Sequence, residues 1–286
     1  MWGLRKMPEV LEERKDLAPV YLLQKEKERS RELYEEAFPE DTPEFVNYYY
    51  EYKTADNQIL VLEKDGKIIS MLHLNPYIMI VNGYEVLTDY IVAVATRKEY
   101  RHQGYMRTLM EYALQDVGKK EIPFVFLMPA SENLYIPFDF VWISSHQELP
   151  FRVKKMDADG QNRYLASKYQ VFCKRDERYI RNLDAEMAAE ENEKISQHIP
   201  PYMARITNVK LMLQMTRCLN EKNIYLHIRD SIIAQNDGYY YWRCTREESH
   251  IRKLEKVPEK IDIDLTIGEL TAMVFESFHI FLSEFV

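Results

Sequence analysis

The first half of the chain shows hydrophobic patterns that predict both helices and paired strands. Apolar residues recur on one face of residues 30–38, a spacing typical of an amphipathic helix. Pro43 favours the first turn of a second helix through residues 45–52. The dipeptides Asp65-Gly66 and Asn82-Gly83 favour hairpin turns between extended segments. The predicted strands are residues 59–64, 67–74, 77–81 and 84–87.

A strand–helix–strand unit follows these hairpins. Residues 90–96 are apolar with almost no polar break, as expected for a central strand that is buried on both faces. An amphipathic helix follows through Val117, and Gly118 is predicted to end it. Residues 124–128 form a second short apolar strand. Such a unit is a parallel, right-handed crossover by default, so the first half is predicted to have a mixed α/β fold.

The pattern changes in the second half. Residues 154–162 are polar and turn-rich, and residues 178–194 predict an acidic, solvated helix. After Pro200-Pro201, a further series of short elements begins. These are a helix at 209–219, strands at 224–228, 232–233, 239–242 and 261–267, and a helix at 270–275. We predict three parts: a first domain at 1–149, a connector with a helix at 150–199, and a small α+β domain at 200–286.

Composition narrows the class of protein. The chain has 286 residues, 46% of them hydrophobic, with a formal net charge of −8, which disfavours binding to nucleic acid. No apolar run approaches the ~20 residues of a membrane span, and residues 1–14 lack the apolar stretch of a secretion signal. Neither the three cysteines nor the seven histidines have metal-ligand spacing. We therefore expect a cytoplasmic protein without a metal, and no partnership with membrane or nucleic acid.

The most informative segment is 94–106, where the buried strand leads through a polar turn into the helix. Arg101-x-x-Gly104 lies where that helix begins. Amides at a helix start are unpaired and the dipole adds positive charge, so they can bind an anion. Gly104 would let a pyrophosphate approach the backbone, and Arg101 and Arg107 add charge. Taken alone, the motif is equally compatible with an ordinary helix start.

The pattern V-A-T-x-x-x-Y-R-x-x-G-x-M resembles the acetyl-CoA-binding motif of the GNAT superfamily of N-acetyltransferases. The resemblance implies a splayed mixed sheet, with the pantetheine arm of acetyl-CoA paired to the free strand edge. Residues that would line the pantetheine are Val94, Ala95 and Thr96. Residues whose amides would hold the pyrophosphate are His102, Gln103, Gly104, Tyr105 and Met106.

Other segments resemble a narrower group, the enhanced-intracellular-survival (Eis) type of acetyltransferase. Residues 130–140 are similar to its A-S-E...Y-x-x-F-G-Y/F segment, which implies Ser131 and Asn133 as further cofactor contacts. Residues 205–209, 230–238 and 267–270 resemble parts of its C-terminal sterol-carrier-like domain. Longer relatives carry a second acetyltransferase-like lobe, so the resemblance also implies a chain that is shortened in the middle.

Acetyl transfer to an amine needs a proton donor for the leaving thiolate and a base for the ammonium. Tyr135 is the candidate donor, because a phenol with a pKa of about 10 is protonated at pH 7; the alternative is a core tyrosine. For the base, the resemblance implies the C-terminal carboxylate, here Val286. Burial of the apolar tail would carry this carboxylate into the protein, although the tail could equally pack on its own domain. Asp89, Glu85 and Glu284 are alternatives.

The expected function is transfer of acetyl from acetyl-CoA to a primary amine of an aminoglycoside-like or polyamine-like molecule or of a protein. Transfer should be direct, since no cysteine or serine lies in the motif. Rival interpretations are a non-catalytic acetyl-CoA sensor and a lipid carrier. The resemblance also allows a homo-oligomer. The runs Tyr48–Tyr50 and Tyr239–Tyr241 could face a cationic ligand or alternate between core and surface.

Overall fold

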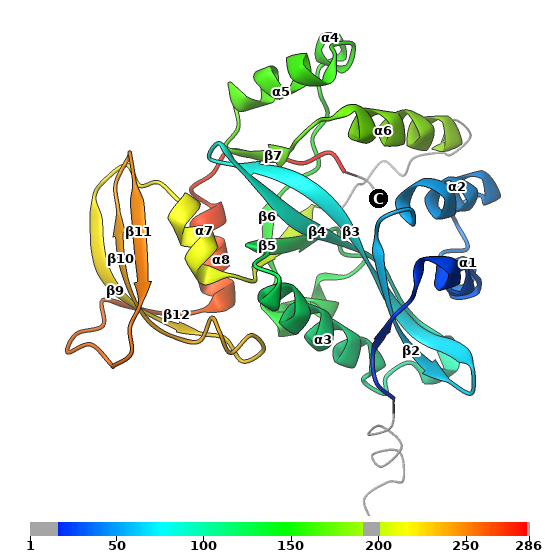
Figure 1. Cartoon of the computed structure of the whole chain (residues 1–286), viewed down its shortest axis with the longest axis horizontal. Coiled ribbons are helices and arrows are strands. Elements are labelled where there is room, and N and C mark those ends of the chain that lie inside the picture. The colour runs from blue at the N-terminus through cyan, green and yellow to red at the C-terminus, as the bar shows by residue number, and fades with distance from the viewer. Residues whose placement is uncertain (1–16, 191–200, 285–286) are drawn as a thin grey trace, which may run out of the picture.

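The computed structural model describes residues 17–190 and 201–284, which form two sheets joined by helices (Figure 1). Nine strands make the larger sheet, in the order β1-β2-β3-β4-β5-β8-β6, with β7 beside β3 and β13 beside β7. Its strands are β1 Val20–Tyr21, β2 Gln58–Lys64, β3 Lys67–Val81, β4 Tyr84–Thr96, β5 Phe124–Leu127, β6 Val141–Ser144, β7 Val171–Cys173, β8 Tyr202–Ile206 and β13 Ile280–Phe281. Antiparallel and parallel pairs are mixed, which confirms the predicted fold class.

Both predicted hairpins are present in this sheet. Asp65 and Gly66 have φ of 52° and 76°, and Asn82 and Gly83 have 48° and 82°, so all four adopt the left-handed conformation that tight hairpins need. The breaks expected after Leu74 and Leu87 are absent, and β3 and β4 each run on as one strand. Pro76 is tolerated within β3, because one edge of the strand is unpaired at this position. On that edge the pairing with β2 ends at Leu74, and the pairing with β7 starts only at Met79.

Helices cover the two faces of the larger sheet separately (Figure 1). On one face lie η3 (Gln24–Ser30), α1 (Arg31–Ala37), α2 (Pro43–Tyr48) and the π-helical turn η4 (Tyr49–Lys53). On the other lies α3 (Tyr105–Lys119), which extends past the end predicted at Gly118. The buried face of α3 packs on β2 to β5, so β4–α3–β5 is the expected crossover unit with a parallel strand pair.

The segment between the two sheets contains more structure than its polar sequence predicts. Helix α5 (Ala158–Ala166) occupies the second half of the stretch predicted to be turn-rich, and helix α4 (Phe151–Lys154) ends where that stretch begins. The Asp157 carboxylate accepts from the Gly160 amide at the start of α5. Helix α6 (Glu177–Glu190) follows β7. Strand β8 inserts between β5 and β6, so the first residues after Pro201 belong to the larger sheet.

The smaller sheet contains four strands in the order β11-β10-β9-β12. They are β9 Lys222–Arg229, β10 Gly238–Cys244, β11 Ser249–Lys253 and β12 Ile263–Thr266. Helices α7 (Val209–Met215) and α8 (Ile267–Phe275) lie between the sheets, and one hydrophobic cluster includes residues of both sheets and both helices. Because this core is continuous, the boundaries at 149 and 199 stay predictions.

The sequence prediction does not include β11, and two further segments of this region differ from it. Ile232 and Ile233 lie in the loop before β10, not in a strand, because Ile233 packs on α3, where Gly118 leaves room for it. The strand predicted through residue 267 ends at Thr266, whose side chain caps α8 together with Glu269. Within the described residues, none of the helices is long and apolar enough to cross a membrane.

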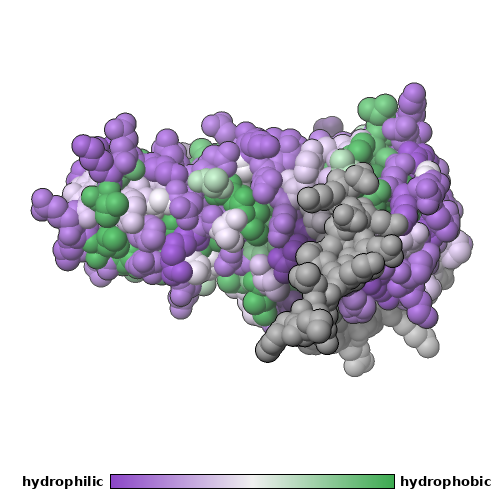
Figure 2. Space-filling model, turned by 90° about the horizontal axis from the view of Figure 1, so that it is seen from below, coloured by the Kyte–Doolittle hydropathy of each residue, from purple (hydrophilic) through white to green (hydrophobic). Residues whose placement is uncertain are grey.

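On the face shown in Figure 2, hydrophilic residues predominate over hydrophobic ones. The hydrophobic residues there form small separate groups, an ordinary distribution for a protein surface in water.

Candidate active site

Strands β4 and β5 separate at the centre of the larger sheet. Their parallel pairing runs from Asp89 opposite Val125 to Ile91 opposite Leu127 and stops there. Strand β4 continues for five more residues, paired with β3 on one side only. The segment 92–96 therefore presents a strand edge that no described strand covers, and an extended, amide-containing ligand can pair with it.

A β-bulge interrupts β4 beside this edge. Met71 pairs with Ala95 and His73 with Val92, so Ala93 and Val94 both lie opposite Leu72. Ala93 has φ of 50°, a conformation that non-glycine residues adopt rarely. Bulges bend a strand and change the direction of its side chains, and they are frequent next to active sites.

The turn after β4 leads into the N-terminus of α3. Gly104 is the N-cap with φ of 87°, and His102 has φ of 61°. The first turn of α3 contains no acidic side chain. Arg101 is exposed and its Nε donates to the Thr96 carbonyl at 3.0 Å, and exposed Arg107 lies 3.3 Å from Glu111. A fifteen-residue helix with glycine and two arginines at its start suits a phosphate group.

The side chains of the predicted cofactor motif are arranged on both sides of its backbone. Tyr105 is buried and Met106 packs against the same cluster, which holds the start of α3 on the sheet. Val94 and Thr96 are half-buried, while Ala95 is buried on the face of α1 and α2. Gln103 donates to the Glu99 carbonyl and stabilises the turn.

Tyr135 lies in the loop after β5, which the described structure folds into two short turns. Ser131 and Asn133 are exposed in the same loop. The Tyr135 ring packs edge-on against Phe140 at 6.0 Å and is only 6% exposed. Burial raises the pKa of its phenol to about 12, so the hydroxyl keeps its proton at neutral pH.

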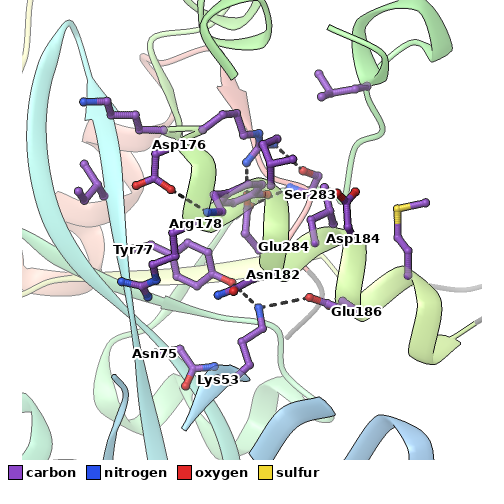
Figure 3. A pocket seen from close by; sticks show the side chains of 18 of the residues that line it. Lys53, Asn75, Tyr77, Asp176, Arg178, Asn182, Asp184, Glu186, Ser283 and Glu284 are labelled. Atoms are coloured by element: carbon purple, nitrogen blue, oxygen red, sulfur yellow. Dashed lines mark hydrogen bonds and ion pairs between the residues drawn. The ribbon is translucent and has the colours of Figure 1, made fainter. Parts of the chain in front are cut away.

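A cavity of about 1480 Å³ opens on the α2 and α6 side of the larger sheet. Figure 3 shows Asn75 and Tyr77 of β3, Lys53 of η4 and Glu186 of α6 around it. The Lys53 ammonium lies 3.2 Å from the Glu186 carboxylate and 3.2 Å from the Tyr77 hydroxyl. Asn75, which lines the cavity, is two residues from His73, and His73 pairs with Val92 beside the β4 bulge. The cavity therefore approaches the open part of β4 from the side of β3.

Acidic groups outnumber basic groups in the lining of this cavity, eight to five. Every basic side chain is already paired with a carboxylate. The pairs are Lys53–Glu186, Lys154–Glu148, Lys174–Glu85, Arg175–Glu284 and Arg178–Asp56. Only four of the eight acidic groups belong to these pairs, because Glu85, the partner of Lys174, is not part of the lining. The cavity therefore has a negative potential that attracts cations.

The C-terminal tail forms part of the cavity wall. Glu284 is buried and lies 2.9 Å from Arg175, and the Tyr179 hydroxyl donates to it at 2.8 Å. Burial alone would raise the pKa of Glu284, but the Arg175 charge and these hydrogen bonds outweigh it and hold the pKa below its usual value. Tyr202 donates to the Glu284 carbonyl. Val286, the predicted base, lies outside the described residues.

The two other carboxylates considered as bases lie away from the cavity. Glu85 is exposed and paired with Lys174 at 2.6 Å. Asp89 is buried, and burial raises its pKa to about 6, with Lys120 near the end of α3 as its main neighbouring charge. Neither lines the cavity. No group of three or more His, Cys, Asp or Glu suited to a metal ion occurs in the part of the chain that the structure describes.

Sequence reasoning did not find most of the cavity residues, such as Asn75, Tyr77, Arg175 and Glu186. They come from β3, α6 and the loop before it, and no local motif links them. The run Tyr48–Tyr50 is a sequence signal for this cavity, because the Tyr48 hydroxyl donates to the cavity residue Glu186 at 2.8 Å. In the other run, Tyr240 is buried while Tyr239 and Tyr241 are partly exposed, which is ordinary strand alternation.

Comparisons with known proteins agree with this geometry. The family model described as an acetyltransferase (GNAT) domain matches residues 21–143, so the chain carries a GNAT N-acetyltransferase domain. No curated protein is significantly similar in sequence.

Solved structures share the fold over most of the chain. Eis1 from Mycobacterium abscessus has a TM-score of 0.66 at 10% identity, with 91% of this chain and 89% of that chain covered. A probable N-acyltransferase from Enterococcus faecalis V583 has 0.64 at 13%, covering 92% and 94%. A GCN5-related N-acetyltransferase from Anabaena variabilis has 0.64 at 15%, covering 90% of each chain.

Proposed function

We propose that this chain transfers an acetyl group from acetyl-CoA directly to a primary amine of a small molecule or a protein. The observation that carries the proposal is the course of β4. It loses its neighbour β5 after Ile91 and continues as an open edge to Thr96, and the turn that follows leads into the N-terminus of α3. An open strand edge followed by a helix start suits a molecule with a peptide-like arm and a diphosphate, and coenzyme A has both.

In this proposal the cofactor follows β4 towards α3. Val94, Ala95 and Thr96 would pair with the pantetheine arm, and Ser131 and Asn133 would face it from the loop after β5. The amides from His102 to Met106 would hold the diphosphate, assisted by Arg101 and Arg107. The left-handed Gly104 and the lack of an acidic side chain in the first turn support this assignment.

The acceptor would enter from the cavity on the opposite side of β4. An alkylammonium has a pKa of about 10.4, so the acidic lining attracts it in its charged form, and a base must then remove a proton. We assign this step to the Val286 carboxylate. The support is the tail before it, which Arg175 and Tyr202 hold in the cavity wall as far as Glu284.

Tyr135 would protonate the leaving thiolate of coenzyme A. Its raised pKa keeps the phenol protonated, and the loop that carries it follows β5, the other arm of the splayed pair. General acids of this kind contribute about 10²–10⁴ in rate.

We further propose that the chain is of the Eis type and that residues 200–286 contain a sterol-carrier-like domain. The four-stranded sheet with α7 and α8 against one face supports a separate unit there, although β8 belongs to the larger sheet. Between β7 and β8 the described residues form one helix and no sheet, as expected for a chain that lacks a second lobe.

The test is release of free thiol from acetyl-CoA in the presence of a panel of primary amines. We expect amine-dependent release, and a Tyr135→Phe variant with kcat lower by about 100-fold but an unchanged KM for acetyl-CoA. Tyr112→Phe is the matched control, because Tyr112 is exposed on the outer side of α3. Binding of acetyl-CoA without turnover on any amine would instead identify a non-catalytic binding protein.

A second variant tests the base. Adding three residues after Val286 moves the terminal carboxylate without changing a side chain, and we expect kcat to fall by about 100-fold or more. If the extended chain keeps the full rate, the Val286 carboxylate is not the base, and one of the side-chain carboxylates must take that role.

A further inference from the structure

The acceptor cavity has an apolar wall as well as an acidic lining. Ile78 of β3 and Leu87 of β4 lie directly opposite each other and are 41% and 52% exposed. Across the cavity, Met187 of α6 is 55% exposed, and Leu183 of the same helix is half-buried. These four residues, which we call the apolar wall, line the cavity from two sides. Large apolar side chains left open to water in a concave site favour a ligand that covers them.

The cavity also has carboxylates that can meet the ammonium group of a ligand. Four of its eight carboxylates are paired with lysine or arginine side chains of the same lining. Asp176 accepts from the Tyr179 amide at the start of α6, and Asp41 accepts from the Tyr34 hydroxyl. Glu40 and Asp184 are the two that hold neither such partner within the described residues. These carboxylates attract an ammonium group, but a further ammonium placed against the apolar wall would lose its hydration there. The apolar wall therefore favours a ligand that has one ammonium and an apolar body.

We infer that the acceptor is a monoamine carried on an apolar body, and that the apolar wall selects it. This rests on the proposed N-acetyltransferase function. Such an amine is either free, as an alkylamine or arylalkylamine, or is the side chain of a lysine between apolar residues of a peptide. Each CH₂ buried from water strengthens binding by about threefold to fourfold, so the length of the apolar part should govern the specificity constant.

The experiment measures thiol release at saturating acetyl-CoA with propylamine, pentylamine and heptylamine, and with spermidine as the polycation. We expect kcat/KM to rise by about 100-fold from propylamine to heptylamine, mostly through a lower KM. Spermidine should be a poorer substrate than heptylamine. A peptide with one lysine between leucines, compared with the same peptide containing serines, distinguishes the two sources of the amine.

Substitutions test whether the apolar wall causes the preference for longer alkylamines. Met187→Gln should lower kcat/KM for heptylamine by at least fivefold and for propylamine by less than twofold. Met156→Gln is the matched control, because Met156 is a methionine of similar exposure, 43%, that does not line the cavity. Since both methionines are exposed, neither change should alter the fold, and a thermal melt verifies this.

The outcomes separate the two proposals. A flat alkylamine series, or a preference for spermidine, overturns the monoamine inference and leaves the acetyltransferase function standing. Equal losses in Met187→Gln and Met156→Gln also overturn it. Acetyl-CoA binding with no turnover on any amine overturns the proposed function, and the inference with it.

Discussion

Burial in the larger sheet changes the proton affinity of single side chains in opposite directions. It raises the pKa of the Asp89 carboxyl to about 6 and lowers that of the buried His73 imidazole to about 3. In both cases the sheet favours the neutral form, because a charge loses its hydration there. The Tyr49 hydroxyl forms a hydrogen bond of 2.8 Å with His73 Nδ1. His73 is therefore a neutral hydrogen-bonding group beside the β4 bulge.

Asp89 allows a prediction with a definite sign. Its folded pKa, about 6, lies above the unfolded value of about 3.9, so the folded state binds more protons between pH 4 and 6. The free energy of unfolding contributed by Asp89 therefore falls as the pH rises through this range. Asp89→Asn removes the ionisation, and we expect it to stabilise the protein by about 2–3 kcal/mol at pH 8 and hardly at all at pH 4.

Urea unfolding at the two pH values measures this difference. Glu85→Gln on the same strand is the control, since Glu85 is an exposed partner of Lys174 and should change stability by less than about 1 kcal/mol. An Asp89→Asn effect of equal size at both pH values would contradict the assignment, because a packing change does not depend on protonation.

At the scale of elements, the sequence predicts what local patterns determine. The turn at Asp65-Gly66, the strand–helix–strand unit and the glycine at the start of α3 follow from neighbouring residues alone. The position of β8 depends instead on pairing with β5 and β6, far away in the chain, and its five residues carry no periodic signal. The candidate site divides in the same way. Most of its cofactor side is one continuous motif at residues 94–107, whereas its cavity consists of residues from Glu40 to Glu284.

The start of α3 gives the prediction for an element. Gly104→Ala places a side chain at φ of 87°, which costs about 1 kcal/mol and shifts the amides that would meet the diphosphate. We expect acetyl-CoA to bind about tenfold more weakly, as measured by isothermal titration calorimetry. Gly83→Ala is the matched control, because Gly83 has φ of 82°, lies in the β3–β4 hairpin and has open space around it.

Both glycine variants should lose similar stability, but only Gly104→Ala should lose affinity. If the two variants bind acetyl-CoA equally well, the diphosphate does not rest on the start of α3, and the proposed cofactor site is wrong.

At the scale of the whole molecule, two buried ion pairs join later segments of the chain to the larger sheet. Arg205 of β8 lies 2.7 Å from Asp230, in the loop after β9, and neither side chain is exposed. Arg175, after β7, lies 2.9 Å from Glu284 of the tail. Removing one partner of such a pair leaves a buried charge, which is far less favourable than removing both. The pairs therefore hold the loop after β9 and the C-terminal tail against the larger sheet.

The Arg175–Glu284 pair links this architecture to the proposed chemistry. Glu284→Gln keeps the shape of the side chain but leaves the Arg175 guanidinium without its counter-charge, and we expect a loss of about 3–5 kcal/mol in chemical unfolding. The double variant Arg175→Met with Glu284→Gln should recover much of that stability. If the pair also positions the tail for catalysis, kcat stays low in this stable double variant, while acetyl-CoA affinity stays normal. Recovery of kcat together with stability would instead show that the pair only holds the fold.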